Sequence, residues 1–212
     1  KLGESVSVLL IGEGAEGIIN QLKNYDLEKI ITVKHELLAS YNADGYSETV
    51  KQVALSISPN VITAGHTYQT RDYMPRVSAK LGAPFIPDVI AANGSGYTKQ
   101  ILNAKLNAEI STSSELFILS FQSATFSEDD LRPGSCEVES FHLELDSNIV
   151  RSVTEDPFQE EQGDVDLESA DVLISVGRGI EKEENVPLAF ELARKMGAEV
   201  SASRPIVDSG WI

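Results

Sequence analysis

The sequence predicts an α/β protein with a mostly parallel sheet, to which antiparallel strands are added. Short apolar runs at 5–11, 29–33, 61–64 and 172–176 alternate with stretches whose apolar residues recur at helical spacing. Glycine, proline and asparagine stand between many of these segments and mark turns. A helix between two apolar strands makes a βαβ unit, and repeated units of this kind build a parallel sheet.

The first βαβ unit is expected near the start of the chain. Residues 5–11 form its first strand, 15–24 a short helix and 29–33 its second strand. A longer helix follows, because Ser47 is a suitable N-cap and apolar residues then line one face as far as Ile57. These segments predict a parallel arrangement for the first half of the chain.

Two residues mark the ends of the next helix, which follows the strand at 61–64. Pro75 is expected in its first turn, where a missing N–H costs nothing, and Gly82 is expected to end it. The preceding segment, His66–Asp72, is polar and lies at the carboxyl end of a strand. We expect this segment to be a surface loop.

Antiparallel strands are expected after this helix. The segments 97–102, 106–110 and 116–121 alternate or run apolar at short spacing, which is typical of hairpins added to a parallel sheet. A fourth segment, 137–145, is expected to add one more strand, with its apolar side chains at Val138, Phe141, Leu143 and Leu145.

A change of composition marks a domain boundary. Acidic residues surround Pro157 and Gly163, which is typical of a solvated linker. The sequence therefore predicts an α/β domain over 1–148, an acidic linker over 149–170 and a second domain within 171–212. A docking surface for a basic partner is the other interpretation of the acidic run.

The second domain is predicted to begin with another βαβ unit. The apolar run 172–176 is typical of a strand covered on both faces. Apolar residues at helical spacing over 187–196 then predict an amphipathic helix that Gly197 closes.

Two loops at the carboxyl ends of these strands carry arginine. Gly177, Arg178 and Gly179 follow the first strand, and Ser203 and Arg204 end the next. Open α/β sheets bind ligands at this edge, so the two cationic loops predict an anion-facing crevice. The alternative is an ordinary turn with a solvent-facing arginine, which is favoured by three nearby acidic residues, Glu181, Glu183 and Glu184.

Composition excludes several kinds of partner. The formal net charge of -16 argues against nucleic acid and anionic membranes, which bind basic surfaces. The single cysteine, Cys136, cannot form an internal disulfide, so we expect a reducing compartment, the cytoplasm or the mitochondrial matrix. No apolar run is long enough to cross a bilayer. The three histidines, His35, His66 and His142, lack metal-ligand spacing, and no hydrolytic motif is present.

A dinucleotide fingerprint near the start gives an alternative function. Gly12, Gly14 and Gly17 follow a predicted strand and open a helix, and Glu36 stands about twenty residues further on as a possible ribose ligand. This spacing is compatible with an NAD-dependent oxidoreductase, although two glutamates inside the motif would repel a pyrophosphate. An adenine-nucleotide-binding module is a further alternative for a parallel sheet of this kind.

Several segments together resemble the electron transfer flavoprotein alpha subunit. Four segments resemble the start of that family's FAD-binding domain: Gly177-Arg178-Gly179, Glu184-Asn185, Gly197-Ala198 and 201–210. The family's N-terminal domain is resembled upstream, in the same order, by 61–65, 74–82 and 84–89. The resemblance covers most of the chain and is weak between about 121 and 164.

The resemblance implies both a fold and a role. It implies an adenine nucleotide alpha hydrolase-like, Rossmann-like N-terminal domain, followed by the beginning of a second Rossmann-like domain that binds FAD. The family's alpha subunit pairs with a beta subunit. The heterodimer carries electrons from dehydrogenases, such as acyl-CoA dehydrogenases, to a quinone oxidoreductase or another acceptor. The resemblance thus implies an electron carrier rather than an enzyme that turns over a substrate, and no nucleotide at the glycine fingerprint.

The family's FAD contacts fall on the two cationic loops. The resemblance places them at Gly177, Arg178, Gly179, Ser203 and Arg204, with the Arg204 guanidinium over the isoalloxazine. The sequence begins inside what resembles the family's first helix and stops before the segments that supply most of the family's FAD contacts. We therefore expect FAD binding by these residues alone to be weak or absent.

Overall fold

The computed structural model describes residues 5–94, 96–127, 131–152, 154–155, 167 and 169–212. The chain divides into two compact units, unit 1 over Lys1–Glu155 and unit 2 over Asp156–Ile212. Much of the predicted acidic linker lies outside the described residues.

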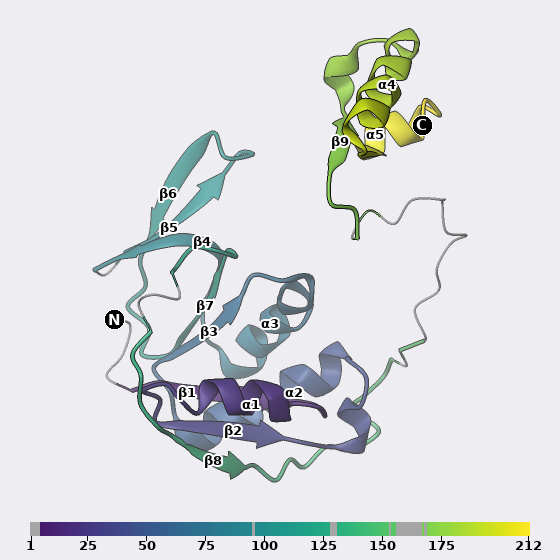
Figure 1. Ribbon diagram of the computed structural model, residues 1–212. Helices are drawn as coiled ribbons and strands as arrows, with labels where there is room; N and C mark the ends of the chain where they lie inside the picture. Colours follow the sequence, from purple (N-terminus) through teal and green to yellow (C-terminus); the bar gives the residue numbers. More distant parts are fainter. Residues whose placement is uncertain (1–4, 95, 128–130, 153, 156–166, 168) are drawn as a thin grey trace. The chain divides into compact units, whose positions relative to one another are not determined.

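Unit 1 contains the predicted mixture of strands and helices (Figure 1). Its strands are β1 (Ser7–Ile11), β2 (Lys29–Val33), β3 (Val61–Gly65), β4 (Phe85–Asn93), β5 (Gly96–Ile101), β6 (Leu106–Ile110), β7 (Phe117–Phe121) and β8 (Glu137–Ser140). Its helices are α1 (Glu16–Leu22), the 3-10 turn η1 (Glu36–Leu38), α2 (Ala43–Ile57) and α3 (Tyr68–Leu81).

The strands of unit 1 form two sheets. One has the order β1-β2-β8 and is entirely parallel, and the other has the order β3-β7-β4-β5-β6. In the second sheet β7 is parallel to β3 and β4, whereas β5 is antiparallel to β4 and β6. The predicted mostly parallel α/β fold with added antiparallel strands is confirmed.

Two strands run differently from their predicted direction. The segment 116–121 was expected to be antiparallel, but β7 lies between two parallel neighbours with its central residues buried. Its apolar run reflects cover on both faces, as in other parallel strands. The segment 137–145 was also expected to add an antiparallel strand, but only Glu137–Ser140 is a strand and it is parallel to β2. Val138 is 48% exposed there, whereas Leu143 beyond the strand is buried.

Helix α2 begins before the predicted cap. Asn42 is its N-cap, and the Asn42 side-chain oxygen accepts a hydrogen bond of 2.7 Å from the Gly45 amide. Ser47 lies fully buried inside the helix and donates to the Asp44 carbonyl. The prediction of Ser47 as the cap was wrong because Asn42, which has the same capping chemistry, stands one turn earlier.

Helix α3 also begins before its predicted start. Thr67 caps it, and its hydroxyl accepts a hydrogen bond from the Thr70 amide. The segment predicted as a surface loop, His66–Asp72, therefore contains the first turn of the helix. Pro75 lies in the helix interior rather than in the first turn, and it is exposed. Water can hydrogen-bond to a carbonyl that a proline leaves unpaired on an exposed face.

The core of unit 1 is built around α2. Val53 packs with Ile31, Val33, Leu38 and Leu143 against the three-stranded sheet. Val50, on the same helix, packs in a second cluster with Met74, Val77, Ala83 and Ile118, which come from α3, the turn after it and the five-stranded sheet. One helix thus contributes to the cores beside both sheets.

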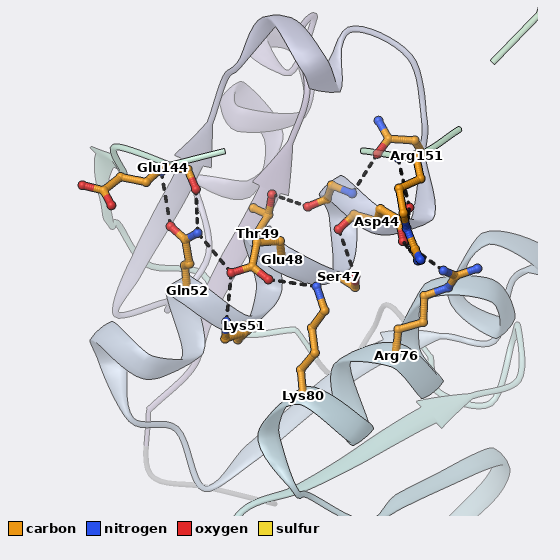
Figure 2. Close-up of polar contacts among 12 residues, drawn as sticks. Asp44, Ser47, Glu48, Thr49, Lys51, Gln52, Arg76, Lys80, Glu144 and Arg151 are labelled. Carbon is orange, nitrogen blue, oxygen red and sulfur yellow. Dashed lines mark hydrogen bonds and ion pairs between the residues drawn. The ribbon is translucent and has the colours of Figure 1, made fainter. Parts of the chain in front are cut away.

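Polar contacts join α2 to the segment that follows β8 (Figure 2). The Gln52 amide donates to the Glu144 carbonyl at 2.7 Å and accepts from the Glu144 amide at 3.3 Å. Further along, Arg151 Nη2 lies 3.2 Å from Asp44 Oδ1, which also pairs with Arg76. The hydrogen bond from Arg151 is the main cause that lowers the pKa of Asp44.

Unit 2 contains a parallel pair of strands, β9 (Leu173–Val176) and β10 (Glu199–Ala202). The 3-10 turns η3 (Arg178–Ile180) and η4 (Glu183–Asn185) and helix α4 (Val186–Met196) connect them, and α5 (Arg204–Asp208) follows β10. Helix α4 ends at Gly197 with φ +64°, as predicted.

The packing of unit 2 differs from the predicted pattern. The buried residues of α4 are Val186, Ala189 and Ala193, and its larger apolar side chains are exposed at Leu188, Phe190, Leu192 and Met196. Strand β9 was expected to be covered on both faces, but Leu173 is 38% exposed. Within the described part of this unit, small side chains let α4 lie close to two strands, and the larger ones point away from that contact.

Candidate functional site

The two loops predicted to face an anion follow neighbouring strands of unit 2. Strands β9 and β10 are in register, with Val176 opposite Ala202. The Ser203 amide donates a hydrogen bond of 2.9 Å to the Val176 carbonyl. The chain therefore leaves both strands at the same edge, and a Cβ atom added to Gly177 would lie 4.0 Å from Ser203 Oγ.

The glycines of the first loop leave open space. Gly177 has an extended backbone with φ -120°, which any residue can adopt. A Cβ atom added to Gly179 would meet no heavy atom within 4 Å. The backbone conformation therefore does not require glycine at Gly177, and the space beside Gly179 is open. A bare backbone of this kind leaves its N–H groups accessible.

The two arginines are accessible to an anion. Arg178 begins η3, is exposed and has no ion pair among the described residues. Arg204 begins α5 and its side chain is 91% exposed, with Nε 3.6 Å from Asp208 Oδ2. An exposed pair at this distance contributes little free energy, so the Arg204 guanidinium can turn toward a ligand.

Of the glycines in the alternative fingerprint, Gly12 and Gly14 lie between β1 and α1, and Gly17 lies in the first turn of α1. Gly12 and Gly14 have φ of +103° and +78°, so the turn itself needs glycine at both positions. A Cβ atom added to Gly12 would lie 3.6 Å from the Leu38 carbonyl oxygen. The tight turn is therefore a sufficient reason for these glycines, and a nucleotide at this point stays a prediction.

The described residues contain no group of three or more histidine, cysteine, aspartate or glutamate side chains that could hold a metal ion. None of the helices in this part of the chain is both long and apolar enough to cross a membrane.

Comparison with known proteins gives the family. The family model described as "Electron transfer flavoprotein domain" matches residues 1–146, and the one described as "Electron transfer flavoprotein FAD-binding domain" matches residues 166–212. The chain belongs to the electron transfer flavoprotein family. The second match includes both arginine loops described above.

Curated relatives of this electron transfer flavoprotein chain carry the name of the alpha subunit. It is 29% identical to "Electron transfer flavoprotein subunit alpha" of Bacillus subtilis, over 99% of this chain and 65% of the relative. The subunit alpha of Syntrophomonas wolfei is 27% identical, over 100% of this chain and 68% of the relative. "Probable electron transfer flavoprotein subunit alpha, mitochondrial" of Caenorhabditis elegans is 27% identical, over 100% of this chain and 64% of the relative. The chain thus spans about two thirds of the length of these relatives.

One cluster in unit 1 was missed by the sequence analysis. Ser120, His66 and Asp88 come from three separate segments and form a hydrogen-bonded group beside the carboxyl end of β3. The only sequence signal is Ser120 itself, a polar residue inside the apolar run of β7. A buried polar residue in such a run needs a partner, which could have directed attention to this cluster.

Proposed function

We propose that this chain is the alpha-subunit component of an electron transfer flavoprotein and holds FAD at the loops after β9 and β10. It would act with a beta subunit and carry electrons from dehydrogenases, such as acyl-CoA dehydrogenases, to a quinone oxidoreductase or a similar acceptor. The observation that carries the proposal is the match of 166–212 to the family's FAD-binding domain, over two open loops at one sheet edge. We place the protein in the cytoplasm, or in the mitochondrial matrix for a eukaryotic source.

The roles of individual residues follow from their places in the loops. Gly177 and Gly179 leave the backbone accessible, and Arg178 supplies a positive charge for the phosphates of FAD. Ser203, beside Gly177, offers a hydroxyl to the same region. FAD itself supplies the redox chemistry, and the chain positions it and adjusts its charge environment.

The Arg204 guanidinium has the role of stabilising negative charge on the flavin ring. One unit charge at ~4 Å and an effective dielectric of ~20 gives an upper value of roughly 4 kcal/mol. The Arg204 side chain is 91% exposed in this structure, which weakens the effect. With about 1–2 kcal/mol remaining, the one-electron potential shifts by roughly 50–100 mV.

The test is Arg204→Ala in the complete heterodimer, with the FAD potential measured by spectroelectrochemical titration. We expect the midpoint potential to fall by roughly 50–100 mV, whereas Arg204→Lys, which keeps the charge, loses less. Arg194→Ala, in the last turn of α4, is the matched control for losing one exposed charge. Unchanged potentials in Arg204→Ala would remove Arg204 from this role.

FAD binding by the residues described here is expected to be weak. A tight ligand site buries most of the ligand surface, and two exposed loops on a two-stranded sheet bury little of it. We expect this chain to be colourless when it is purified without a beta subunit, and the heterodimer to be yellow. Stoichiometric flavin absorbance of the chain by itself would contradict this expectation.

A further inference from the structure

A concavity of ≈ 510 Å³ in unit 1 lies beside the carboxyl end of β3. Its lining comes from the residue after β3, from α3 and from β4 and β5 (Figure 1). This volume is in the range of sites for small molecules. All of its lining residues belong to unit 1, whereas the arginine loops belong to unit 2.

A hydrogen-bonded network joins two residues that line the concavity, His66 and Asp88. Ser120 is fully buried, and its Oγ lies 2.8 Å from His66 Nδ1 and accepts from the Asp88 amide at 3.3 Å. The Asp88 carboxylate accepts a hydrogen bond of 2.9 Å from the Gln122 side chain and lies 3.7 Å from His66 Nε2. The Gln122 amide thus engages one oxygen of the Asp88 carboxylate, which also lines the concavity.

The backbone of β4 is distorted at the same place. The register of β4 with β7 shifts between Ile86 and Val89, and Asp88 has φ +65°. An aspartate in the left-handed region costs free energy, and a bulge changes the direction in which a side chain points. Both features are typical of positions where a strand shapes a binding site.

Two cations line the concavity without a carboxylate partner. Arg71, from α3, and Lys99, from β5, both contribute to its wall. Neither makes an ion pair within the described part of the chain, although Arg71 lies over the Tyr68 ring. In a chain with net charge -16, these two cations outnumber the one carboxylate that lines the concavity, Asp88, and so favour an anion there.

Part of the remaining wall is apolar. Pro75, Phe85 and Pro87 line the concavity together with the two cations, His66 and Asp88. The aromatic ring of Phe85 can pack against a planar apolar group, and the cations can bind a phosphate. The residues that line the concavity therefore favour a ligand that has both a phosphate and a planar apolar group.

We propose that this concavity binds a small aryl phosphate, with the phosphate at Arg71 and Lys99 and the flat body against Phe85 and the two prolines. The Ser120–His66–Asp88 network positions the His66 and Asp88 side chains and does no chemistry. Binding at this concavity needs neither FAD nor a partner subunit. Its test is therefore separate from the test of the proposed function.

The test uses phenyl phosphate as the probe on the full chain, followed by NMR of the three histidine rings. We expect saturable shifts of the His66 signals with a Kd of about 1 mM, while the signals of His35 and His142 stay in place. Inorganic phosphate and phenol, which each lack one part, are expected to bind at least about tenfold more weakly. Absence of saturation at about 20 mM phenyl phosphate overturns the proposal, and equal binding of inorganic phosphate overturns the role of the apolar wall.

The double variant Arg71→Ala with Lys99→Ala locates the site. It should weaken phenyl phosphate binding at least about tenfold, because each cation contributes a charge-assisted hydrogen bond. Lys105→Ala with Arg132→Ala removes the same two charges from exposed positions outside the concavity and should leave the Kd unchanged. Circular dichroism checks that both variants are folded. Unchanged affinity in the first variant overturns the proposal.

Discussion

The buried carboxylate of Glu48 makes the stability of unit 1 sensitive to acid. Glu48 lies on α2, is 8% exposed, and accepts hydrogen bonds from Lys80 at 2.8 Å, Lys51 at 3.0 Å and Gln52 at 3.2 Å (Figure 2). Burial alone would raise the pKa of this carboxyl, but the three donors together outweigh it and lower the pKa from 4.5 to about 2.

The size of the effect follows from the two pKa values. The folded state holds the proton less tightly than the unfolded state, so the charged carboxylate stabilises the fold above pH 4.5 and this contribution is lost as the pH falls toward 2. The difference in pKa corresponds to roughly 3 kcal/mol at neutral pH. By linkage, roughly 1 kcal/mol of it is lost at pH 4 and roughly 2 kcal/mol at pH 3.

The perturbation is Glu48→Gln, measured by urea denaturation at pH 7 and pH 4. Circular dichroism at 222 nm follows the helices of both units, including α2 and α3, and the fluorescence of Trp211, the single tryptophan, follows unit 2 separately. We expect the variant to be about 2–3 kcal/mol less stable at pH 7 and this gap to narrow by roughly 1 kcal/mol at pH 4.

The control is Glu16→Gln, which removes an exposed ion pair with Lys34. Its stability should match that of the parent chain within error at both pH values, because exposed pairs contribute little. The reasoning would be refuted if the difference in unfolding free energy between Glu48→Gln and the parent chain were the same at pH 7 and pH 4. The lowered pKa of Glu48 would then have no effect on folding.

Three further substitutions test the helix ends and can be compared by their urea midpoints. Gly82→Ala should lower the free energy of unfolding by about 1 kcal/mol, because Gly82 ends α3 with φ +64°. Gly17→Ala should raise it by about 0.5–1 kcal/mol, because Gly17 lies inside α1 with open space around it. Effects of the same sign at the two glycines would contradict this backbone argument. Asn42→Ala should cost about 1–2 kcal/mol because it removes the buried cap of α2; a cost no larger than that of a surface substitution would exclude this capping role.

Local signals in the sequence were sufficient to predict many elements but not all of their ends. Strand β2 occupies the predicted residues 29–33, and Gly197 ends α4 as expected, because apolar runs and C-cap glycines act over a few residues. The start of α2 was misplaced because Asn42 and Ser47 have the same capping chemistry. The start of α3 was misplaced because Pro75, which is typical of a first turn, lies in the helix interior. Which of several caps is used depends on how the helix packs.

Strand direction and the cluster in unit 1 depend on distant residues. The apolar run of β7 reported its burial, but its direction is set by pairing with β3, more than fifty residues earlier. His66 and Ser120 are 54 residues apart, and Ser120 and Asp88 are 32 apart, so no local pattern joins them. The arginine loops of unit 2, by contrast, lie directly after apolar strands, which is why the sequence predicted them as a candidate site.

Strands β6 and β8 each stand at the edge of a sheet, and most of their residues are exposed. In the described part of the chain β6 is hydrogen-bonded to β5 alone and β8 to β2 alone. Each therefore presents a row of backbone amides and carbonyls to which another extended peptide could add. The net charge of -16 keeps copies of the chain apart in dilute buffer, and added salt screens that repulsion. Purification and storage at low ionic strength would therefore protect these two edges from self-association.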